Sequence, residues 1–454
     1  MTKTAHHRNE LPSTTGAVLL PEDDDYRAEI EGFQTAYTHR PAVVVAAVHA
    51  EDVRAAVEYA ARHGLPIAVQ ATGHGLAAPA DGGVLITTRR MKDIRIDAAA
   101  RTARVAAGVQ AGELIAAAAA HGLAPLNGSS NSVGVVGYTL GGGLGLLARE
   151  FGYAADHVRV IEIVTADGRL RRLAPGDELF GAVLGTGGNF GVVTALELEL
   201  LPVTTVYGGQ LQFDAPLVPQ ALEAWRLWTT DLADQLTSAF GMMTMPDIPQ
   251  FPAHLRGRYL ATINIAYTGS EADGEHLVAP LRAIGERFTD NLKVLPYTES
   301  HTIHSDPPQP HPYTATNALL AELPADATDA FLEATGPGSD LPVVAGFRHL
   351  GGALSRPAAY ESAVDHRDAQ YVARAIALPG PDAAAITAGL ARIRKTVEPW
   401  AIGTNLNFLY GGGDRGESET RSAYTATTYD RLAALKSKYD ADNLFRFNRN
   451  IQPR

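Results

Sequence analysis

The chain has 454 residues, a length that predicts two or three domains, and 46% of the residues are hydrophobic. Its net charge of −12, without a block of Lys and Arg, disfavours nucleic acid and anionic membrane surfaces as partners. The lack of cysteine excludes disulfides, thiolate nucleophiles, Cys-ligated zinc and iron–sulfur clusters. We find neither an apolar signal region nor an apolar run of membrane-spanning length, so we expect a cytoplasmic protein.

Regular hydrophobic patterns begin after about residue 40, because the first 40 residues read as polar and irregular. The expected elements up to Pro202 are strands 41–48 and 66–70 around a helix at 51–63, strand 84–86, a hairpin at 95–97 and 102–107, a helix at 111–120, a hairpin across Asp167-Gly168, and strand 192–200. The opening order is therefore β-α-β-turn-β, and Pro202 marks a domain boundary.

The pattern changes between residues 204 and about 410. Alternating apolar stretches that begin at 209, 261, 343 and 371 are separated by helical stretches near 217–235, 271–287 and 383–397. This order predicts an antiparallel sheet backed by helices, an α+β arrangement. The Pro-rich segment 301–312 is expected to be an exposed loop, and an amphipathic helix is expected at 417–438.

The densest glycine pattern is Gly128 to Gly145, which reads GSSNSVGVVGYTLGGGLG. Because glycine allows other groups to approach the backbone closely, this density predicts a backbone shaped around a ligand rather than a packed helix or strand. Interleaved Val and Leu residues argue against a solvated surface loop. A second candidate is the turn Ala71-Thr72-Gly73-His74-Gly75, which follows a buried-looking strand.

Other sites are less well supported. Gly143 to Ala148 matches the pattern G-x-G-x-x-A of nicotinamide dinucleotide sites, but the segment soon breaks at Gly152 and enters a hairpin. Taken alone, His74 favours a turn histidine bonded to the backbone, and no metal-ligand spacing accompanies it, so no metal is expected. No G-x-S-x-G motif indicates a serine hydrolase.

Several motifs together resemble the berberine bridge enzyme-like flavoproteins of the vanillyl-alcohol oxidase / p-cresol methylhydroxylase (PCMH) superfamily. They are Gly73-His74, Asp81-Gly82-Gly83, the 128–145 glycine stretch, Asp177-Glu-Leu-Phe, the glycine group 187–194 and the ending 439–451. The resemblance spans about 40–203 and 411–454, and the middle of the chain matches loosely.

The resemblance implies an α+β fold in which a two-subdomain PCMH-type FAD-binding domain is joined to a substrate domain with an antiparallel sheet backed by helices. The corresponding ranges are an N-terminal segment 1–40, an FAD-binding domain 41–203, a substrate domain 204–410 and a C-terminal segment 411–454 that returns to the FAD domain.

The resemblance also implies that FAD is bonded covalently to the histidine at position 74. Many members add a bond from a cysteine that falls at Ser130; since the chain has no cysteine, we expect attachment through His74 only. The residues implied to contact FAD are Ala71, Thr72, Gly73, His74, Gly75, Ser130, Val133, Gly134, Gly137, Tyr138, Gly141, Gly142, Gly145, Val193, Asn448 and Asn450. Backbone N–H groups at glycine turns can bind a pyrophosphate without a positive side chain.

The implied catalytic residues are Tyr138, Tyr410, His366 and Asn407. Tyr138 falls near flavin N1 and C2=O, where a hydroxyl can stabilise charge; packing under the ring is the open alternative. The family's common Tyr-x-Asn reads Asn405-Leu-Asn407 here. Tyr410 is a substitute for the missing phenol, although on a strand it would face away from Asn405. For His366 the alternative is a structural charge pair with Arg367 on the sheet.

The implied activity is that of an FAD-dependent oxidase. A small alcohol, amine or secondary-metabolite substrate gives a hydride to flavin N5, and O2 reoxidises the flavin and yields H2O2. Two alternatives stay open: a flavoprotein that binds or sequesters a drug-like metabolite, and a dehydrogenase with poor O2 reactivity. The expected partners are a small-molecule substrate and O2, in a monomer or homodimer.

Overall fold

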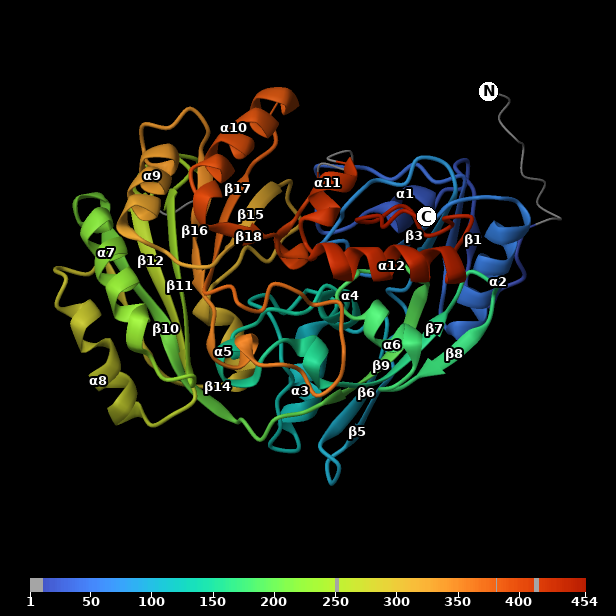
Figure 1. The fold of residues 1–454 in the computed structure, drawn as a ribbon, viewed down its shortest axis with the longest axis horizontal. Helices are drawn as coiled ribbons and strands as arrows, with labels where there is room; N and C mark the ends of the chain where they lie inside the picture. The colour runs from blue at the N-terminus through green and yellow to red at the C-terminus, as the bar shows by residue number, and fades with distance from the viewer. Residues whose placement is uncertain (1–10, 250–252, 381, 412–415) are drawn as a thin grey trace.

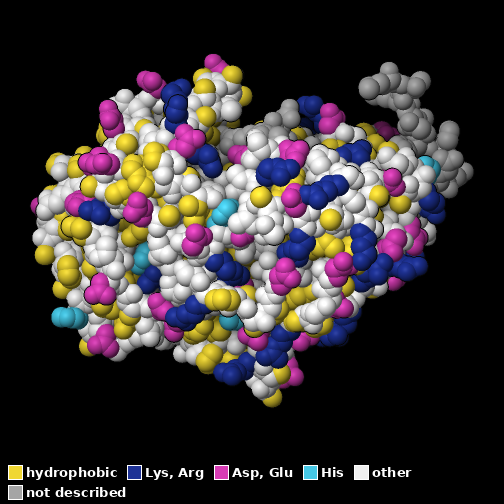
Figure 2. All heavy atoms as spheres, viewed as in Figure 1, with side chains coloured by type: hydrophobic (Ala, Val, Ile, Leu, Met, Phe, Trp, Pro, Cys, Tyr) yellow, Lys and Arg dark blue, Asp and Glu magenta, His cyan; other side chains and the backbone are white. Residues whose placement is uncertain are grey.

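The computed structural model describes residues 11–249, 253–380, 382–411 and 416–454. Three sheets organise them, with strand orders β1-β2-β4-β3, β5-β6-β9-β7-β8 and β13-β10-β12-β11-β16-β17-β15-β18, the last with β14 paired to β10 (Figure 1). In the described part of the chain, no helix is long and apolar enough to cross a membrane. Lys and Arg side chains are mixed with Asp and Glu on the face shown in Figure 2.

The four-stranded sheet confirms the β-α-β-turn-β prediction. β2 (Val43–Ala46), β4 (Val84–Thr87) and β3 (Ile67–Gln70) are parallel, and α2 (Ala50–Arg62) connects the first and the last of them. β2 and β4 are buried at every position, as expected of parallel strands covered on both faces. The prediction that residues 1–40 are irregular is wrong in its described part, since 11–40 contain β1 (Val18–Leu19) and α1 (Tyr26–Ile30).

The five-stranded sheet confirms both predicted hairpins. Its strands are β5 (Ile94–Asp97), β6 (Thr102–Ala106), β9 (Val192–Glu199), β7 (Val158–Val164) and β8 (Leu170–Leu173), all antiparallel. Val45 and Ile86 of the first sheet share one apolar core with Val105, Ile161 and Leu196 of the second. The two small sheets therefore form one packed half, accompanied by the helices α3 (Ala111–Ala119), α4 (Val135–Leu140), α5 (Ala148–Phe151) and α6 (Glu178–Val183).

The nine-stranded sheet forms the other half and confirms the predicted antiparallel sheet backed by helices. Its strands are β10 (Thr205–Asp214), β11 (Leu236–Thr244), β12 (Tyr259–Tyr267), β13 (Thr289–Asp290), β14 (Lys293–Pro296), β15 (Thr314–Leu320), β16 (Val343–His349), β17 (Tyr371–Ala377) and β18 (Ala401–Gly403). Its outer face is covered by α7 (Val218–Trp228), α8 (Glu271–Arg282), α9 (Ala325–Thr335) and α10 (Ala383–Lys395), on the left in Figure 1.

The two faces of this sheet serve different cores. Phe347, Ala373 and Ala375 pack with the helix-side core, whereas Val372 belongs to the core of the opposite half. Because side chains alternate across a strand, residues of the same parity as Val372 face the two small sheets. This inner face is the one available to a ligand held between the halves.

The C-terminal segment contains two helices instead of the single helix expected at 417–438. α11 (Gly416–Arg421) ends before Thr425, whose side chain accepts a hydrogen bond from Thr428 N and starts α12 (Ala426–Tyr439). α12 lies along the half formed by the two small sheets (Figure 1). The Tyr424 hydroxyl donates to Gly185 O there, at 2.9 Å.

Candidate functional site

His74, in the turn after β3, is held by two contacts to its ring and one to its backbone. Gly73 adopts φ +76°, a left-handed conformation that glycine tolerates. The imidazole stacks on Phe33, with 3.7 Å between the ring centroids, and Nε2 lies 2.9 Å from Ser132 Oγ. The Tyr313 hydroxyl donates to the His74 carbonyl at 2.7 Å. Within the described residues the ring makes no other hydrogen bond, so Nδ1 is left without one.

The electrostatics of this turn keep the imidazole neutral. Burial lowers the pKa of His74 to about 4, although the charge of Asp306 opposes that shift. The Ser132 hydroxyl can accept from Nε2–H, which leaves a lone pair at Nδ1. A neutral imidazole with one uncommitted nitrogen is the form that can make a covalent bond to carbon.

The two predicted halves of the cofactor site meet at this turn. A Cβ atom at Gly134 would lie 3.6 Å from Ala71 Cβ and 3.7 Å from the Thr72 side chain. Ser130 Oγ is 3.0 Å from Ser132 Oγ, so His74, Ser132 and Ser130 form a hydrogen-bonded chain. The glycine stretch and the histidine turn therefore act as one surface.

Part of the glycine stretch is helical, which contradicts the expectation of a non-helical backbone. α4 forms because Val135, Val136, Thr139 and Leu140 are buried at helical spacing. Gly137 lies on the exposed side of this helix, and no described atom would lie within 4 Å of a Cβ placed there. The same holds for Gly75, so both glycines present bare backbone to open space.

Other predicted FAD contacts pack against protein. A Cβ at Gly141 would meet the Asn407 amide at 2.7 Å, one at Gly145 the Tyr138 hydroxyl at 2.6 Å, and one at Gly142 the Val364 side chain at 3.4 Å. Val193 is buried in the core, whereas Val133 is half-buried. Small residues at the three glycine positions are therefore explained by protein packing, and their contact with FAD stays a prediction.

Asn407 holds the glycine segment through the backbone. Its Oδ1 accepts from Gly143 N at 2.8 Å, and its Nδ2 donates to the Tyr138 carbonyl at 3.0 Å. Asn407 lies in the short 3-10 helix η8 (Leu406–Phe408), so the strand considered for 405–410 is not formed. Both ends of its amide are occupied, which indicates a positioning role; its catalytic assignment stays a prediction.

Three buried polar atoms of the predicted FAD contacts have no hydrogen-bond partner in the described part of the chain. They are the Tyr138 hydroxyl and the Oδ1 atoms of Asn448 and Asn450. Burial raises the pKa of Tyr138, so its phenol stays protonated and can donate. Since buried polar groups are normally paired, these atoms indicate a ligand with both donors and acceptors.

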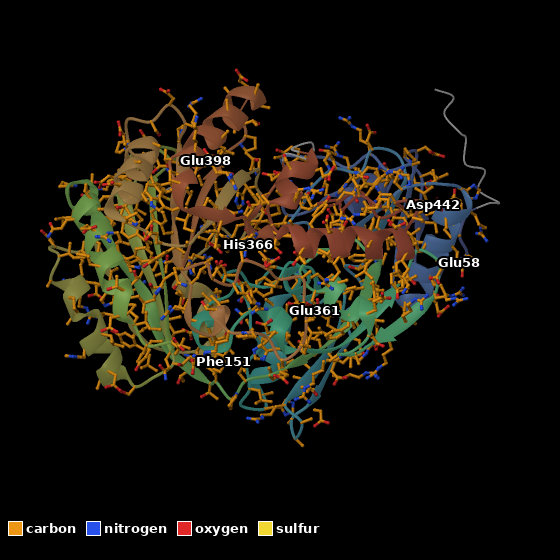
Figure 3. All side chains as sticks on the ribbon, in the orientation of Figure 1. Glu58, Phe151, Glu361, His366, Glu398 and Asp442 are labelled. Carbon is orange, nitrogen blue, oxygen red and sulfur yellow. The ribbon has the colours of Figure 1, made fainter. Side chains whose placement is uncertain are left out.

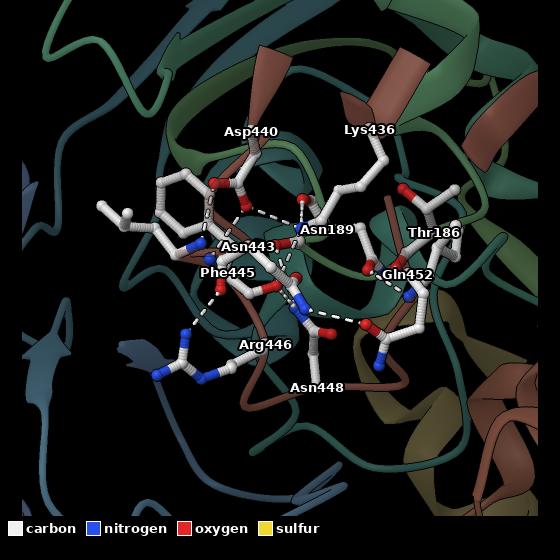
Figure 4. Close-up of polar contacts among 12 residues, drawn as sticks. Thr186, Asn189, Lys436, Asp440, Asn443, Phe445, Arg446, Asn448 and Gln452 are labelled. Atoms are coloured by element: carbon white, nitrogen blue, oxygen red, sulfur yellow. Dashed lines mark hydrogen bonds and ion pairs between the residues drawn. The ribbon is translucent and has the colours of Figure 1, made fainter. Parts of the chain in front are cut away.

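Lys436 holds the C-terminal tail beside the glycine group 187–194. Its Nζ is buried and donates to Asn189 O at 2.6 Å, Asp440 Oδ2 at 2.7 Å and Phe445 O at 3.0 Å (Figure 4). Asn448 Nδ2 donates to Gly188 O at 3.2 Å. No described atom would lie within 4 Å of a Cβ at Gly187 or Gly188.

Together these features fit FAD. Bare glycine backbone at 75, 137, 187 and 188 allows close approach of a large cofactor, and the unpaired atoms of Tyr138, Asn448 and Asn450 offer one donor and two acceptors. The site lies where the two small sheets meet the inner face of the nine-stranded sheet.

Asp306 belongs to this site and was missed by the sequence reasoning. Residues 297–303 form the 3-10 helix η5 (Tyr297–Ile303) and Ile303 is buried, so the prediction of an exposed loop at 301–312 is wrong in that part. Asp306 Oδ2 accepts from Ser129 Oγ at 2.5 Å. Desolvation works against its charge, but the Ser129 hydroxyl and the charges of Arg374 and Arg348 keep the pKa of Asp306 below its usual value, and the residue as a whole is exposed.

Tyr410 lies edge-on to Tyr313, with 5.2 Å between the centroids. Burial raises the pKa of Tyr410, while Arg374 and Arg348 oppose the rise. The phenol is therefore protonated at neutral pH and can donate a hydrogen bond. Within the described residues its hydroxyl makes no hydrogen bond, which leaves that donor for a ligand.

The predicted charge pair of His366 and Arg367 is wrong. Both residues precede β17, and Arg367 pairs with Asp156 at 2.5 Å and lies over the Tyr153 ring. His366 has φ +53°, and a Cβ at Gly403 would clash with its ring. Figure 3 shows His366 in the middle of the molecule, between the nine-stranded sheet and the other half. Its catalytic assignment stays a prediction.

Two small sheets with one shared core, a histidine turn against a glycine stretch, and a covering antiparallel sheet define a PCMH-type FAD-binding oxidoreductase. Residues 41–174 match the family model described as FAD binding domain, and residues 413–452 match the one described as berberine and berberine like. These matches support the resemblance to the berberine bridge enzyme-like FAD-linked oxidoreductases that the motifs predicted.

Individual relatives agree with this assignment. The chain is 29% identical to (R)-6-hydroxynicotine oxidase of Paenarthrobacter nicotinovorans, over 97% of each chain. The crystal structure of 6-hydroxy-D-nicotine oxidase from Arthrobacter nicotinovorans superposes with a TM-score of 0.84 at 26% identity, covering 97% of this chain and 99% of that one. The first half of the sequence is itself similar to bacterial D-specific hydroxynicotine oxidase, and these two comparisons support that similarity.

A second similar structure shares the fold. Glucooligosaccharide oxidase from Acremonium strictum has a TM-score of 0.83 at 18% identity over 97% of each chain, and is described as carrying 6-S-cysteinyl, 8α-N1-histidyl FAD. The present chain is therefore an enzyme that uses FAD to oxidise or reduce a small molecule.

Proposed function

We propose that the chain is an oxidase whose FAD is attached covalently through His74 alone, with O2 as the electron acceptor. The observation that carries the attachment is the His74 ring: it is neutral, stacked on Phe33, and bonded at Nε2 to Ser132 while Nδ1 has no bond among the described residues. Ser130, next in the hydrogen-bonded chain, has no thiol to offer.

FAD, when bound, supplies the acceptor for a hydride from substrate carbon. The chain's own residues would then handle the proton of the substrate O–H or N–H. Asp306 is already ionised and can accept that proton at a carboxylate oxygen. Tyr410 can donate a hydrogen bond from its protonated phenol, and thereby orient the same substrate atom.

An ionised acceptor beside the cofactor site favours turnover over simple sequestration of a metabolite. A protein that only binds its ligand has no need for a carboxylate in position to take a proton. The missing tyrosine at position 405 therefore does not by itself argue against catalysis, since Asp306 supplies a different acceptor.

Acid denaturation tests the covalent bond. Yellow colour should stay with the precipitated wild-type protein and pass to the supernatant for His74→Ala, while His63→Ala, at an exposed position, should behave as wild type. Flavin released from the wild-type pellet would contradict the attachment. Stoichiometric H2O2 formation with O2 consumption tests the oxidase assignment separately, using alcohols and cyclic amines as substrates.

A further inference from the structure

Two arginines share the inner face of the nine-stranded sheet. Arg348 on β16 and Arg374 on β17 lie on adjacent strands, with Arg348 opposite Val372 and Arg374 opposite Gly346. Both guanidinium groups lie over the ring of Phe408, at 4.9 and 5.4 Å from Cζ to the ring centroid. Two cations therefore converge on one place beside η8.

Neither arginine has a hydrogen-bond or ion-pair partner among the residues that the structure describes. Arg348 is only 7% exposed, and its Nε is buried without a hydrogen bond. Arg149 shows what a structural arginine looks like in this fold: it is 4% exposed, and its guanidinium donates to the carbonyls of Leu232, Leu236 and Leu350. The fold can therefore provide hydrogen-bond acceptors for a buried guanidinium, but it provides none for Arg348 among the described residues.

The surrounding charges do not balance the pair. The negative charge of Asp306 raises the pKa of Arg348, but Asp306 lies beyond ion-pair distance of it and accepts a hydrogen bond from Ser129. Tyr138 and Tyr410 stay protonated, and burial lowers the pKa of His304 to about 3, so that ring is neutral. Two cations thus face one anion. An uncompensated buried charge is costly and is typical of a site completed by a ligand.

The sheet carries no side chains beside Arg374 on the next two strands to one side. Gly241 of β11 is opposite Gly346 of β16, which is opposite Arg374, so two consecutive strands carry no side chain next to that arginine. Arg348 also lines a pocket with His304, Asn264 and Gly145, between the sheet and the glycine stretch. A ligand group can therefore approach Arg348 from this pocket, and Arg374 lies beside it over the same Phe408 ring.

We propose that Arg348 and Arg374 bind a carboxylate of the substrate, so that the enzyme acts on an alcohol or amine that also carries a carboxylate. A guanidinium presents paired N–H donors that match the two oxygens of a carboxylate. The bound anion would leave two negative and two positive charges in the site. This inference rests on the proposed function, since it takes the space beside Asp306 and Tyr410 as the place of the substrate.

Ligand binding to the oxidised holoenzyme tests the proposal without turnover. Benzoate and its neutral analogue benzamide are titrated while the flavin absorbance is recorded. Wild type should bind benzoate saturably and at least tenfold more tightly than benzamide. Arg348→Met and Arg374→Met should each lose that preference. Arg258→Met is the matched control, because Arg258 also lies over a phenylalanine ring, Phe288, but is paired with Asp214 at 2.5 Å.

Several results would overturn the proposal. Equal binding of benzoate and benzamide by wild type would do so without any variant, even if a variant failed to fold. An unchanged preference in both arginine variants, combined with weaker binding of sulfite to the flavin, would assign the arginines to the cofactor instead. Loss of O2 consumption or of covalent flavin bears on the proposed function alone, because the titration requires only bound oxidised flavin.

Discussion

Asp306 and Tyr410 show how neighbouring groups divide acid and base roles. Desolvation disfavours charge on both side chains, although Asp306 is an exposed residue, yet the net effect on the two pKa values differs. Asp306 has the Ser129 hydroxyl and nearby arginines to stabilise its negative charge, so its pKa falls, whereas the pKa of Tyr410 remains raised despite the same arginines. At neutral pH the site therefore contains one ionised acceptor and one protonated donor.

Asp306→Asn should slow flavin reduction by about 10²- to 10⁴-fold, because it removes the proton acceptor while keeping the shape and the bond from Ser129. Anaerobic stopped-flow reduction by an identified alcohol or amine substrate measures this step. Glu322→Gln, at an exposed position, is the control and should reduce as fast as wild type. Unchanged reduction by the Asp306 variant would remove Asp306 from the mechanism.

Sequence motifs could predict only those site residues that lie next to one another in the chain. The His74 turn and the glycine stretch were predicted because their composition is unusual over a few residues, and the structure brings them together. Phe33, Asp306, Arg348 and Arg374 carry no local signal. They reach the site only through tertiary contacts, such as the stack of Phe33 on His74 from a segment that reads as irregular.

At the scale of elements, α12 and the tail behind it are held by one buried ion pair. Lys436 and Asp440 are fully buried, and Asp440 also accepts from the backbone N–H groups of Leu444 and Phe445 at 2.7 and 3.0 Å. Burial lowers the pKa of Lys436, and Asp440 opposes that shift. The pair therefore bends the chain back after the helix and sets the position of Asn448.

Lys436→Met should destabilise the protein by about 3–5 kcal/mol, because it leaves the carboxylate of Asp440 buried and unpaired. Urea unfolding followed by fluorescence measures the loss. Lys438→Met is the matched control on the same helix: its partner is Glu178 and both side chains are more than half exposed, so little or no loss of stability is expected. A similar effect of both substitutions would argue against this role for the buried pair.

Periodicity predicted most strands and helices, since buried faces impose a period on the sequence. It failed where ends depend on distant contacts. The single helix expected at 417–438 is split at Thr425, whose backbone N–H and hydroxyl also bond to Asp365 at 2.8 and 2.9 Å. Likewise, 405–410 lacks a strand because Asn405 and Asn407 engage Asn317 and Gly143.

For the whole molecule, the junction between the two halves depends on a neutral histidine. Arg149 of α5 reaches the nine-stranded sheet and lies 3.0 Å from His349 Nε2, at the end of β16. A protonated histidine could not accept from this guanidinium. Burial, and then the charge of Arg149, lower the pKa of His349 to about 3. Contact between the halves is therefore linked to pH.

The sign of this linkage follows from the two states. The unfolded chain binds a proton at His349 below pH 6.5, while the folded chain does not until about pH 3, so folding is progressively disfavoured as pH falls between these values. The loss is at most about 1.4 kcal/mol per pH unit below 6.5.

His349→Gln keeps an acceptor for Arg149 but cannot titrate. Urea unfolding at pH 7, 6 and 5 should show that the stability of wild type, compared with that of the variant, decreases as the pH falls. The stability of the exposed His63→Gln variant should change with pH as that of wild type does. Parallel curves for His349→Gln and wild type would mean that the junction tolerates a charged histidine.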